Sequence, residues 1–389
     1  MTEKLSARVF SVISEAQAAV EADELKKAER LLSDLLDGEK GLNDYERAQT
    51  HNFRAAVYYE RGDIARAIAD YIAITELENP PQQILHNSFF RLAQLYFMEE
   101  DYEQSVQTLD TWMGLQSGSI RPEAHMLKAQ AYYQQGRFEA AEAPILSALQ
   151  EAKVRKQPLR ESWLALLRAV YYEQERYPEA ARVLGVLVEH WPSASYYRQW
   201  AGMLGLMGQQ TSRLHVLRAA YVKGMLESES DLLNLARLYM SMDIPYPAMG
   251  VLQAGMESGA IEESAANLQL LAQAMSLARE SEAQIAVLEQ AAQLSGEAKH
   301  YMYLGQAHIA LYHWKAAADA FNKALAIGGL DNPGSVLMQM GSAYFQMKAY
   351  GRSLQAFEQA AEYDTYRTQA LQWVEFVQRE VERAQLIGS

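Results

Sequence analysis

Residues 341–360 read GSAYFQMKAYGRSLQAFEQA, and the spacing within this stretch decides the fold. A small residue, Gly341, is followed three positions later by Tyr344, one helical turn along the same face. Ser353, Phe357 and Ala360 stand 12, 16 and 19 positions after Gly341, as a small, a large and a small side chain. This pattern predicts two helices that cross closely where the small side chains meet, with the phenylalanine filling the space beside them.

The same pattern recurs along the chain at intervals of 33 to 39 residues. The positions equivalent to Gly341 are small in nine of ten repeats: Ala16, Ala55, Ala93, Ala129, Arg168, Ala201, Ala236, Ala272, Gly305 and Gly341. We call them anchors. A regular period of this length is the signature of a helical repeat architecture. Two repeats depart from the pattern, because Arg213 and Gln284 stand twelve positions after their anchors, where the others have Ala or Ser.

Helix-breaking residues fall between the predicted helix pairs, for example at Asn79-Pro80-Pro81, Trp191-Pro192 and the Gly328–Gly334 loop. After the last pair, Ala370, Trp373 and Val377 recur at helical spacing, which predicts a terminal helix over the exposed end. The sequence therefore predicts about ten helix pairs over residues 1–364 and a C-terminal capping helix over residues 365–389.

The order of a small residue and tyrosine on the first helix, then Ala, Phe and Ala on the second, resembles the tetratricopeptide repeat (TPR) family. The resemblance covers nearly the whole chain. It implies an all-α fold, a right-handed superhelix (α-solenoid) of helix pairs with a capping helix. It also implies a non-enzymatic scaffold that binds proteins or peptides.

Composition narrows the class of partner. The net charge of −14 and pI near 5.1 disfavour nucleic acid or an anionic membrane surface, because the chain has no basic excess to release counterions. The absence of cysteine excludes disulfides, thiolate nucleophiles and Cys-based metal sites. No apolar run is long enough to span a bilayer, and residues 1–20 lack the apolar core of a signal peptide. We expect a soluble chain that begins at Met1 or is a mature, exported form.

The resemblance implies that the first helix of each pair lines a concave face, and it places the candidate contact residues there. Four aromatic rings four positions past successive anchors form a ladder: Tyr59, Phe97, Tyr133 and Tyr172. Polar side chains one position past the anchors can hydrogen-bond a ligand's main chain: Gln94, Gln130, Arg237, Gln273 and Gln306. Three positions before two anchors stand Phe90 and Met126. The alternative is that these rings only pack against neighbouring helices.

The sequence carries no catalytic motif: a phosphate-binding glycine loop, a serine nucleophile elbow and an HExxH pair are all missing. His308 and His313 are the only close histidine pair, and a separation of five residues on one helix would place them on different faces. We therefore expect no catalytic residue, no metal site and no cofactor.

Several short segments of the sequence resemble those of a narrower group, the TPR proteins encoded with TonB, ExbB and ExbD energy-transducing systems of Gram-negative bacteria. They are the 42–49 segment, the run from Trp163 to Glu173, the Ile244–Ala248 turn, the Gly328–Gly334 loop and the 372–376 segment. This resemblance implies a periplasmic adaptor whose partners are TonB, ExbB, ExbD or an outer-membrane receptor. A cytoplasmic TPR adaptor or regulator and an enzyme-associated subunit remain alternatives, and the oligomeric state is open.

Overall fold

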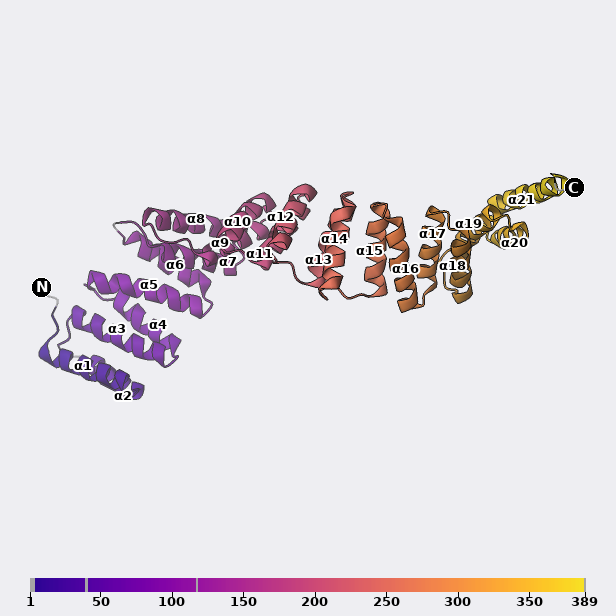
Figure 1. The fold of residues 1–389 in the computed structure, drawn as a ribbon. Helices are drawn as coiled ribbons and strands as arrows, with labels where there is room; N and C mark the ends of the chain where they lie inside the picture. The colour runs from indigo at the N-terminus through magenta and orange to yellow at the C-terminus, as the bar shows by residue number, and fades with distance from the viewer. Residues whose placement is uncertain (1–3, 39–40, 117, 388–389) are drawn as a thin grey trace. The chain divides into compact units, whose positions relative to one another are not determined.

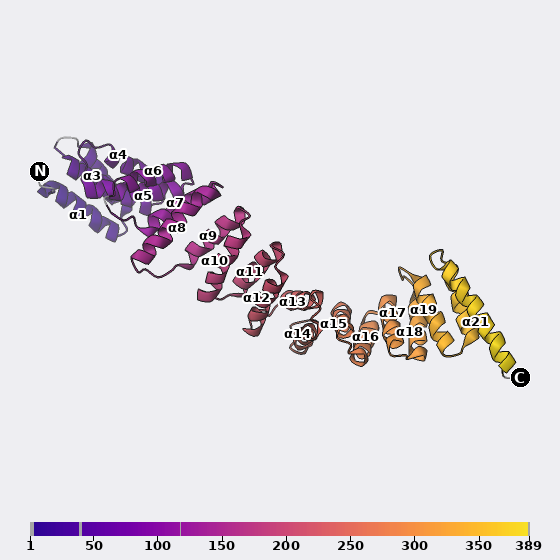
Figure 2. The same ribbon diagram turned by 90° about the horizontal axis from the view of Figure 1, so that it is seen from above.

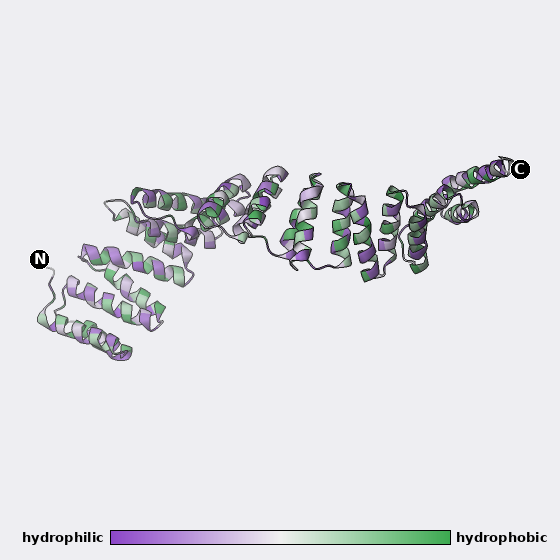
Figure 3. Cartoon of the chain, in the orientation of Figure 1, coloured by the Kyte–Doolittle hydropathy of each residue, from purple (hydrophilic) through white to green (hydrophobic). Residues whose placement is uncertain are grey.

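The computed structural model describes residues 4–38, 41–116 and 118–387, with side chains described as far as residue 383. Throughout these residues the chain is helical, without a strand, and 21 helices follow one another along the chain (Figure 1). Hydrophobic and hydrophilic residues alternate along each helix, as expected for helices that bury one face (Figure 3). The predicted all-α fold is confirmed.

Contacts between helices divide the chain into two units, Met1–Gln209 and Gln210–Ser389. The first contains α1 (Ala7–Glu21), α2 (Leu25–Asp37), α3 (Asp44–Glu60), α4 (Ile64–Thr75), α5 (Gln82–Met98), α6 (Tyr102–Gly114), α7 (Pro122–Gln134), α8 (Phe138–Val154), α9 (Glu161–Glu173), α10 (Tyr177–His190) and α11 (Ala194–Leu206). From α1 to α10 each odd-numbered helix packs on the even-numbered helix that follows it, and each pair packs on the next (Figure 2).

In the second unit the helices pack in the same way from α13 to α20. It contains α12 (Gln210–Val222), α13 (Glu229–Ser241), α14 (Pro245–Glu257), α15 (Ala265–Leu277), α16 (Ser281–Ser295), α17 (Ala298–Ala310), α18 (Trp314–Ile327), α19 (Pro333–Gln346), α20 (Tyr350–Ala360) and α21 (Arg367–Ile387). The last helix packs on α20. Its Trp373 ring stacks on Phe357 with centroids 5.3 Å apart, while Ala370 and Val377 are fully buried, so α21 covers the end of the final pair as predicted.

The anchors are small because the second helix of the pair presses against them. A Cβ atom added to Gly305 would lie 2.5 Å from the Phe321 ring, and one added to Gly341 would lie 2.8 Å from the Phe357 ring. Both rings are fully buried. The large residue sixteen positions after the anchor therefore occupies the space that a side chain at the anchor would need.

Serine is accepted twelve positions after the anchor for a reason that spacing alone did not reveal. Ser105 Oγ donates a 2.8 Å hydrogen bond to the Ala93 carbonyl, and Ser353 Oγ donates one of the same length to the Gly341 carbonyl. Both hydroxyls are buried, so the anchor carbonyl satisfies a group that would otherwise be costly to bury.

All ten turns within the pairs contain a left-handed residue at the same place, seven positions after the anchor. Three are glycine (Gly62, Gly136 and Gly208) and seven are not: Asp23, Glu100, Glu175, Asp243, Arg279, Tyr312 and Lys348. The amide of the next residue then bonds back to the first helix, as Asp101 N does to the Tyr96 carbonyl at 2.9 Å. This closure keeps the turn length constant from pair to pair.

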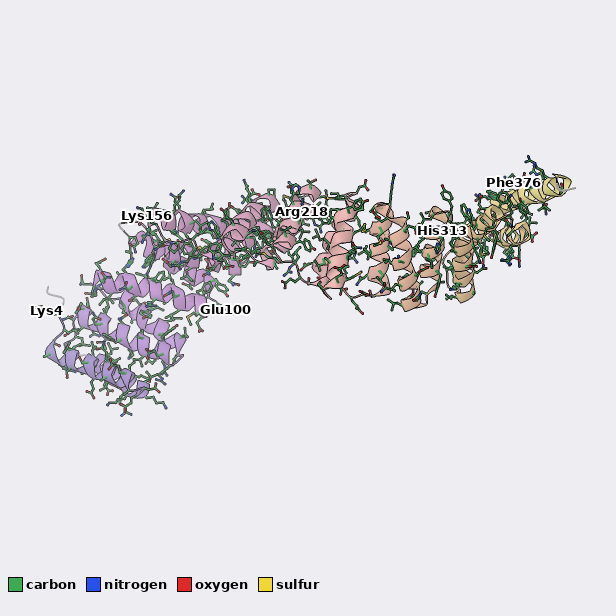
Figure 4. The ribbon with its side chains drawn as sticks, viewed as in Figure 1. Lys4, Glu100, Lys156, Arg218, His313 and Phe376 are labelled. Atoms are coloured by element: carbon green, nitrogen blue, oxygen red, sulfur yellow. The ribbon has the colours of Figure 1, made fainter. Side chains whose placement is uncertain are left out.

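Replacing Glu100 by glycine is expected to stabilise the first unit by about 1 kcal/mol, because its φ of 61° is strained for a residue with a side chain. Glu100 lies at the turn between α5 and α6 (Figure 4). Slower hydrogen exchange of the backbone amides in α5 and α6 would report the increase in stability. Glu99→Gly is the matched control, since Glu99 has an ordinary φ of −81° and should gain nothing. Equal stabilisation by both variants would contradict the strain argument.

Candidate functional site

The first unit carries a groove over α1, α3 and α5, formed by two adjoining pockets of about 690 and 740 Å³. The first is lined by Ala16, Gln17, Val20, Glu21, Leu32, Phe53, Ala56, Val57 and Glu60. The second is lined by Ala56, Tyr59, Glu60, Tyr71, Arg91, Gln94, Leu95 and Met98. The two share Ala56 and Glu60, so they form one continuous groove along the first helices of three successive pairs. We call it the α1–α5 groove.

The walls of the α1–α5 groove combine apolar, aromatic and charged groups. Tyr59 and Met98 are half exposed, at 50% and 52%, and offer adaptable apolar surface. Glu21 and Glu60 bring carboxylates, and Arg91 Nη1 donates a 3.3 Å hydrogen bond to Gln94 Oε1. The groove therefore presents both apolar and charged groups at its surface.

The four rings of the predicted ladder do not have equivalent surroundings. Three of them pack against a ring at the start of the following helix: Phe97 on Tyr102 (5.3 Å between centroids), Tyr133 on Phe138 (5.4 Å) and Tyr172 on Tyr177 (6.2 Å). At the equivalent place beside Tyr59 the chain has Ile64. Packing therefore engages three of the rings, and Tyr59 is the one that lines a groove pocket.

Phe90 and Met126 lie in the core, where the structure gives them a packing role instead of a contact role. Phe90 is 8% exposed and lies under the Arg121 guanidinium, 3.7 Å from its ring centroid, and Met126 is 4% exposed. Both precede an anchor by three positions, which places them on the same face as the anchor and therefore toward the neighbouring helix. Gln130 and Arg237 are exposed and line neither groove described here.

A second groove lies in the other unit, over α15, α16 and α17, with a volume of about 610 Å³. We call it the α15–α17 groove. Its lining brings together Gln273 and Gln306, two of the predicted contact residues, which lie 33 positions apart at the same place in successive repeats. The other lining residues are Gln269, Ala272, Ser276, Gln284, Leu288, Tyr303, Ala307 and Ala310. None of these described residues is charged.

His308 and His313 are not on one continuous helix, contrary to the expectation from the sequence, because α17 ends at Ala310 between them. Their ring centroids are 5.7 Å apart. Burial lowers the pKa of His308, and the neighbouring His313 lowers it further. Within the described residues no three His, Asp or Glu side chains gather as they would around a metal ion. Nor does any helix in this part of the chain have the length and apolarity needed to cross a bilayer.

Comparison with known families matches two parts of the chain. A family model described as a tetratricopeptide repeat matches residues 90–154, and a second with the same description matches residues 334–366. These segments include α6 to α8 in the first unit and the α19–α20 pair in the second. Within these two segments the repeats match tetratricopeptide repeats. The helix pairs outside the two matched segments have the same left-handed residue in the turn between their helices. Proteins built of TPRs act as scaffolds for other proteins.

Similar proteins are TPR proteins too. The TPR repeat-containing protein YpiA of Bacillus subtilis (strain 168) is 24% identical over 392 residues, which cover 90% of this chain and 86% of that protein. A solved TPR protein from Parabacteroides merdae ATCC 43184 is 15% identical, covers 69% of this chain and 100% of its own, and has a TM-score of 0.39. The TPR2AB domain of yeast Sti1 in complex with pHSP90 is 12% identical, with coverages of 67% and 97% and a TM-score of 0.37.

The first unit also contains a buried ionic network between α3 and α4 that was not predicted from the sequence. Asp70, in the second TPR, is 3% exposed and accepts hydrogen bonds from Arg54 Nε and Nη2 at 2.9 and 2.7 Å. His51 Nδ1 lies 2.7 Å from Asp70 Oδ1, and Arg54 Nη1 donates to Ser33 of the first TPR at 3.1 Å. Burial acts to lower the pKa of Arg54, but its bonds to Asp70 outweigh this and raise it. The network holds α3 against α2 and α4.

The sequence did contain a signal for this network. Asp70 interrupts the otherwise apolar stretch Ala67–Ile74, fifteen positions after its anchor, where the other nine repeats have Leu, Thr, Pro, Val or Ala. A lone carboxylate in such a stretch needs a cationic partner in order to be buried. Arg54 and His51 stand on the first helix of the same pair, which makes them the nearest candidates along the chain.

Proposed function

We propose that this protein is a non-enzymatic scaffold that binds an extended segment of a partner protein in the α1–α5 groove. The observation that carries the proposal is the continuity of this groove over three successive TPRs, with the exposed Tyr59 ring on its wall. Tyrosine anchors binding interfaces well because it buries a large area at a low cost in side-chain entropy. The buried network also ties α3, which carries Tyr59, to α2 and α4, so this wall of the groove is pre-organised for binding.

The charges of the groove indicate what kind of segment it accepts. Two carboxylates, Glu21 and Glu60, lie along its walls, and Arg91 lines the second pocket together with Glu60. The whole chain carries a net charge of −14, which attracts a basic partner over a distance. The partner segment is therefore expected to carry an apolar or aromatic residue for the surface beside Tyr59, with Lys or Arg directed toward Glu21.

Replacing Tyr59 by alanine is expected to weaken partner binding at least tenfold, the equivalent of about 1.4 kcal/mol, while leaving stability unchanged because the ring is half exposed. Recovery of a cross-linked partner from cell extract by the tagged wild-type and variant chains measures the effect. Tyr246→Ala is the matched control, an exposed tyrosine in the second unit. A partner recovered equally by wild type and Tyr59→Ala would place the binding surface elsewhere.

The proposal also includes a cellular role, an adaptor of a TonB-type transport system in the periplasm. This role rests only on the short sequence segments that resemble the TPR proteins of such systems. Several of the segments also have a structural role: Asn43 and Glu46 form a capping box at the start of α3, and Trp373 stacks on Phe357. Recovery of TonB, ExbB, ExbD or an outer-membrane receptor with the wild-type chain would support this setting. Partners drawn only from the cytoplasm would favour the alternative, a cytoplasmic adaptor.

A further inference from the structure

Helix α17 carries two histidines in the interior of the second unit. The exposed fractions of His300 and His308 are 2% and 8%. In the described part of the chain, Nε2 of His300 and Nδ1 of His308 are buried without a hydrogen-bond partner. A neutral imidazole tolerates this, since only one of its nitrogens carries a hydrogen. A protonated ring has two N–H donors, so one donor would be buried unbonded together with a positive charge.

His300 lies at the junction between α16 and α17, where its surroundings oppose a positive charge. Its Nδ1 lies 2.7 Å from Ser295 Oγ, which also accepts a 3.1 Å hydrogen bond from the Glu297 amide. The charged groups that act on the ring are Lys299 and Glu297, which form an ion pair with each other. Burial lowers the pKa of His300, and Lys299 lowers it further, while Glu297 acts to raise it. The protein therefore favours the neutral form of this ring.

His308 lies near the other end of α17, beside His313 at the start of α18. The two ring centroids are 5.7 Å apart, so the rings repel each other when both are protonated. On the α16 side, Glu289 and Glu282 act to raise the pKa of His308, but burial and His313 outweigh them and lower it. Acidification therefore adds positive charge at both ends of a helix that packs on α16 and α18.

The repeat fold does not require histidine at either position. Five positions before the anchor, where α17 has His300, the other nine repeats have no histidine, and Thr50, Ala124 and Val336 fill the place while fully buried. Three positions after the anchor, where α17 has His308, six of the ten repeats have tyrosine. In α17 both positions thus carry a group that titrates near neutral pH, which the other repeats lack there.

We propose that α17 is an acid-sensitive element of the second unit, in which protonation of His300 and His308 releases the helix from α16 and α18. The released state exposes both rings to water, where an imidazole has its ordinary pKa of about 6.5. Because the packed state binds these protons less readily, its stability is full above about pH 6.5 and falls as the pH decreases below that value. Since α17 supplies Tyr303 and Gln306 to the α15–α17 groove, acidification also dismantles that groove.

The test is hydrogen exchange of the full chain, resolved by peptide at pH 7.5 and 5.0 and corrected for intrinsic exchange rates. The opening equilibrium of the α17 amides should rise at pH 5.0 by at least about threefold, with a limit of about 30-fold for each histidine. The His300→Val/His308→Tyr double variant takes residues found at the equivalent places of other repeats, and it should lose this rise whatever its stability at pH 7.5. His215→Gln, which replaces an exposed histidine of α12, should retain the rise.

A second measurement uses the wild-type chain, so it does not depend on the folding of the double variant. The NMR signals of the histidine rings, assigned by single replacements, report the protonation of each ring during an acid titration. Those of His300 and His308 should titrate at lower pH than that of His215. The single variant His308→Tyr should show a smaller rise in α17 opening than wild type, because His300 remains. The proposal is overturned if α17 opens equally at both pH values, if the double variant keeps the wild-type rise, or if both rings titrate at or above the pH of His215.

Discussion

Gly305→Ala is expected to destabilise the second unit by about 1–3 kcal/mol, although the change adds a single methyl group. Its Cβ atom would lie 2.5 Å from the Phe321 ring, which is fully buried and cannot move aside without disturbing the α17–α18 pair. Hydrogen exchange resolved by peptide should show faster exchange in α17 and α18. This readout is preferable to a single melting temperature, because a chain of two units need not unfold in one step.

The matched control for this experiment is Gly351→Ala in α20. A Cβ atom at Gly351 meets no atom within 4 Å, so alanine there should be neutral or stabilising through its better helix propensity. Combining Gly305→Ala with Phe321→Leu should recover part of the loss, since the smaller residue vacates the space that the methyl group needs. Equal effects of the two glycine replacements, or no recovery in the double variant, would contradict the packing explanation.

Asp70→Ala is expected to destabilise the first unit by about 3–5 kcal/mol, because it leaves the Arg54 charge largely buried without its partner. The Asp70 side chain is 4% exposed and that of Arg54 17%, so solvent cannot replace the lost bonds without opening the structure. Faster hydrogen exchange in α2, α3 and α4 is the expected signature. Because α3 supplies Tyr59, partner binding in the α1–α5 groove should weaken as well.

An exposed ion pair of the same two TPRs provides the comparison. Arg66 and Glu29 lie 3.3 Å apart, with the Arg66 side chain 59% exposed, and Arg66→Ala should cost less than about 1 kcal/mol. The double variant Arg54→Leu/Asp70→Leu should be less destabilised than Asp70→Ala, since it removes both charges together. A loss on Asp70→Ala no larger than that of Arg66→Ala would show that the buried network does not hold the first two TPRs together.

Sequence periodicity was sufficient to predict the helix pairs. In most repeats a small residue such as Gly341 is followed, sixteen positions later, by a large one such as Phe357. This pairing indicated two facing helices, because the space left by the small residue accommodates the large side chain. The terminal helix was predicted in the same way. Trp373 and Val377 lie on one apolar face of a helix, and such a face must pack against another part of the protein. These inferences succeed because helical period and side-chain size are local properties of the chain.

The contact residues were harder to predict, because a position on a helix does not reveal what packs against it. Phe90 and Met126 were predicted as contact residues from their position relative to the anchors, yet the surrounding helices bury both. Phe97 and Tyr59 occupy equivalent positions, and only the residue at the start of the next helix, Tyr102 or Ile64, separates a packed ring from a free one. The grooves depend on several helices at once, so no single period can mark them.

By itself the sequence determined the all-helical fold, the ten pairs and the final helix, because each follows from spacing within about forty residues. Only the tertiary structure decided which of the predicted side chains line a groove, and that Asp70, Arg54 and His51 meet in the interior. The physical reason is that burial and hydrogen bonding depend on the neighbours that folding supplies. The uncharged α15–α17 groove belongs to this second class, since its four amides gather only when three helices are stacked.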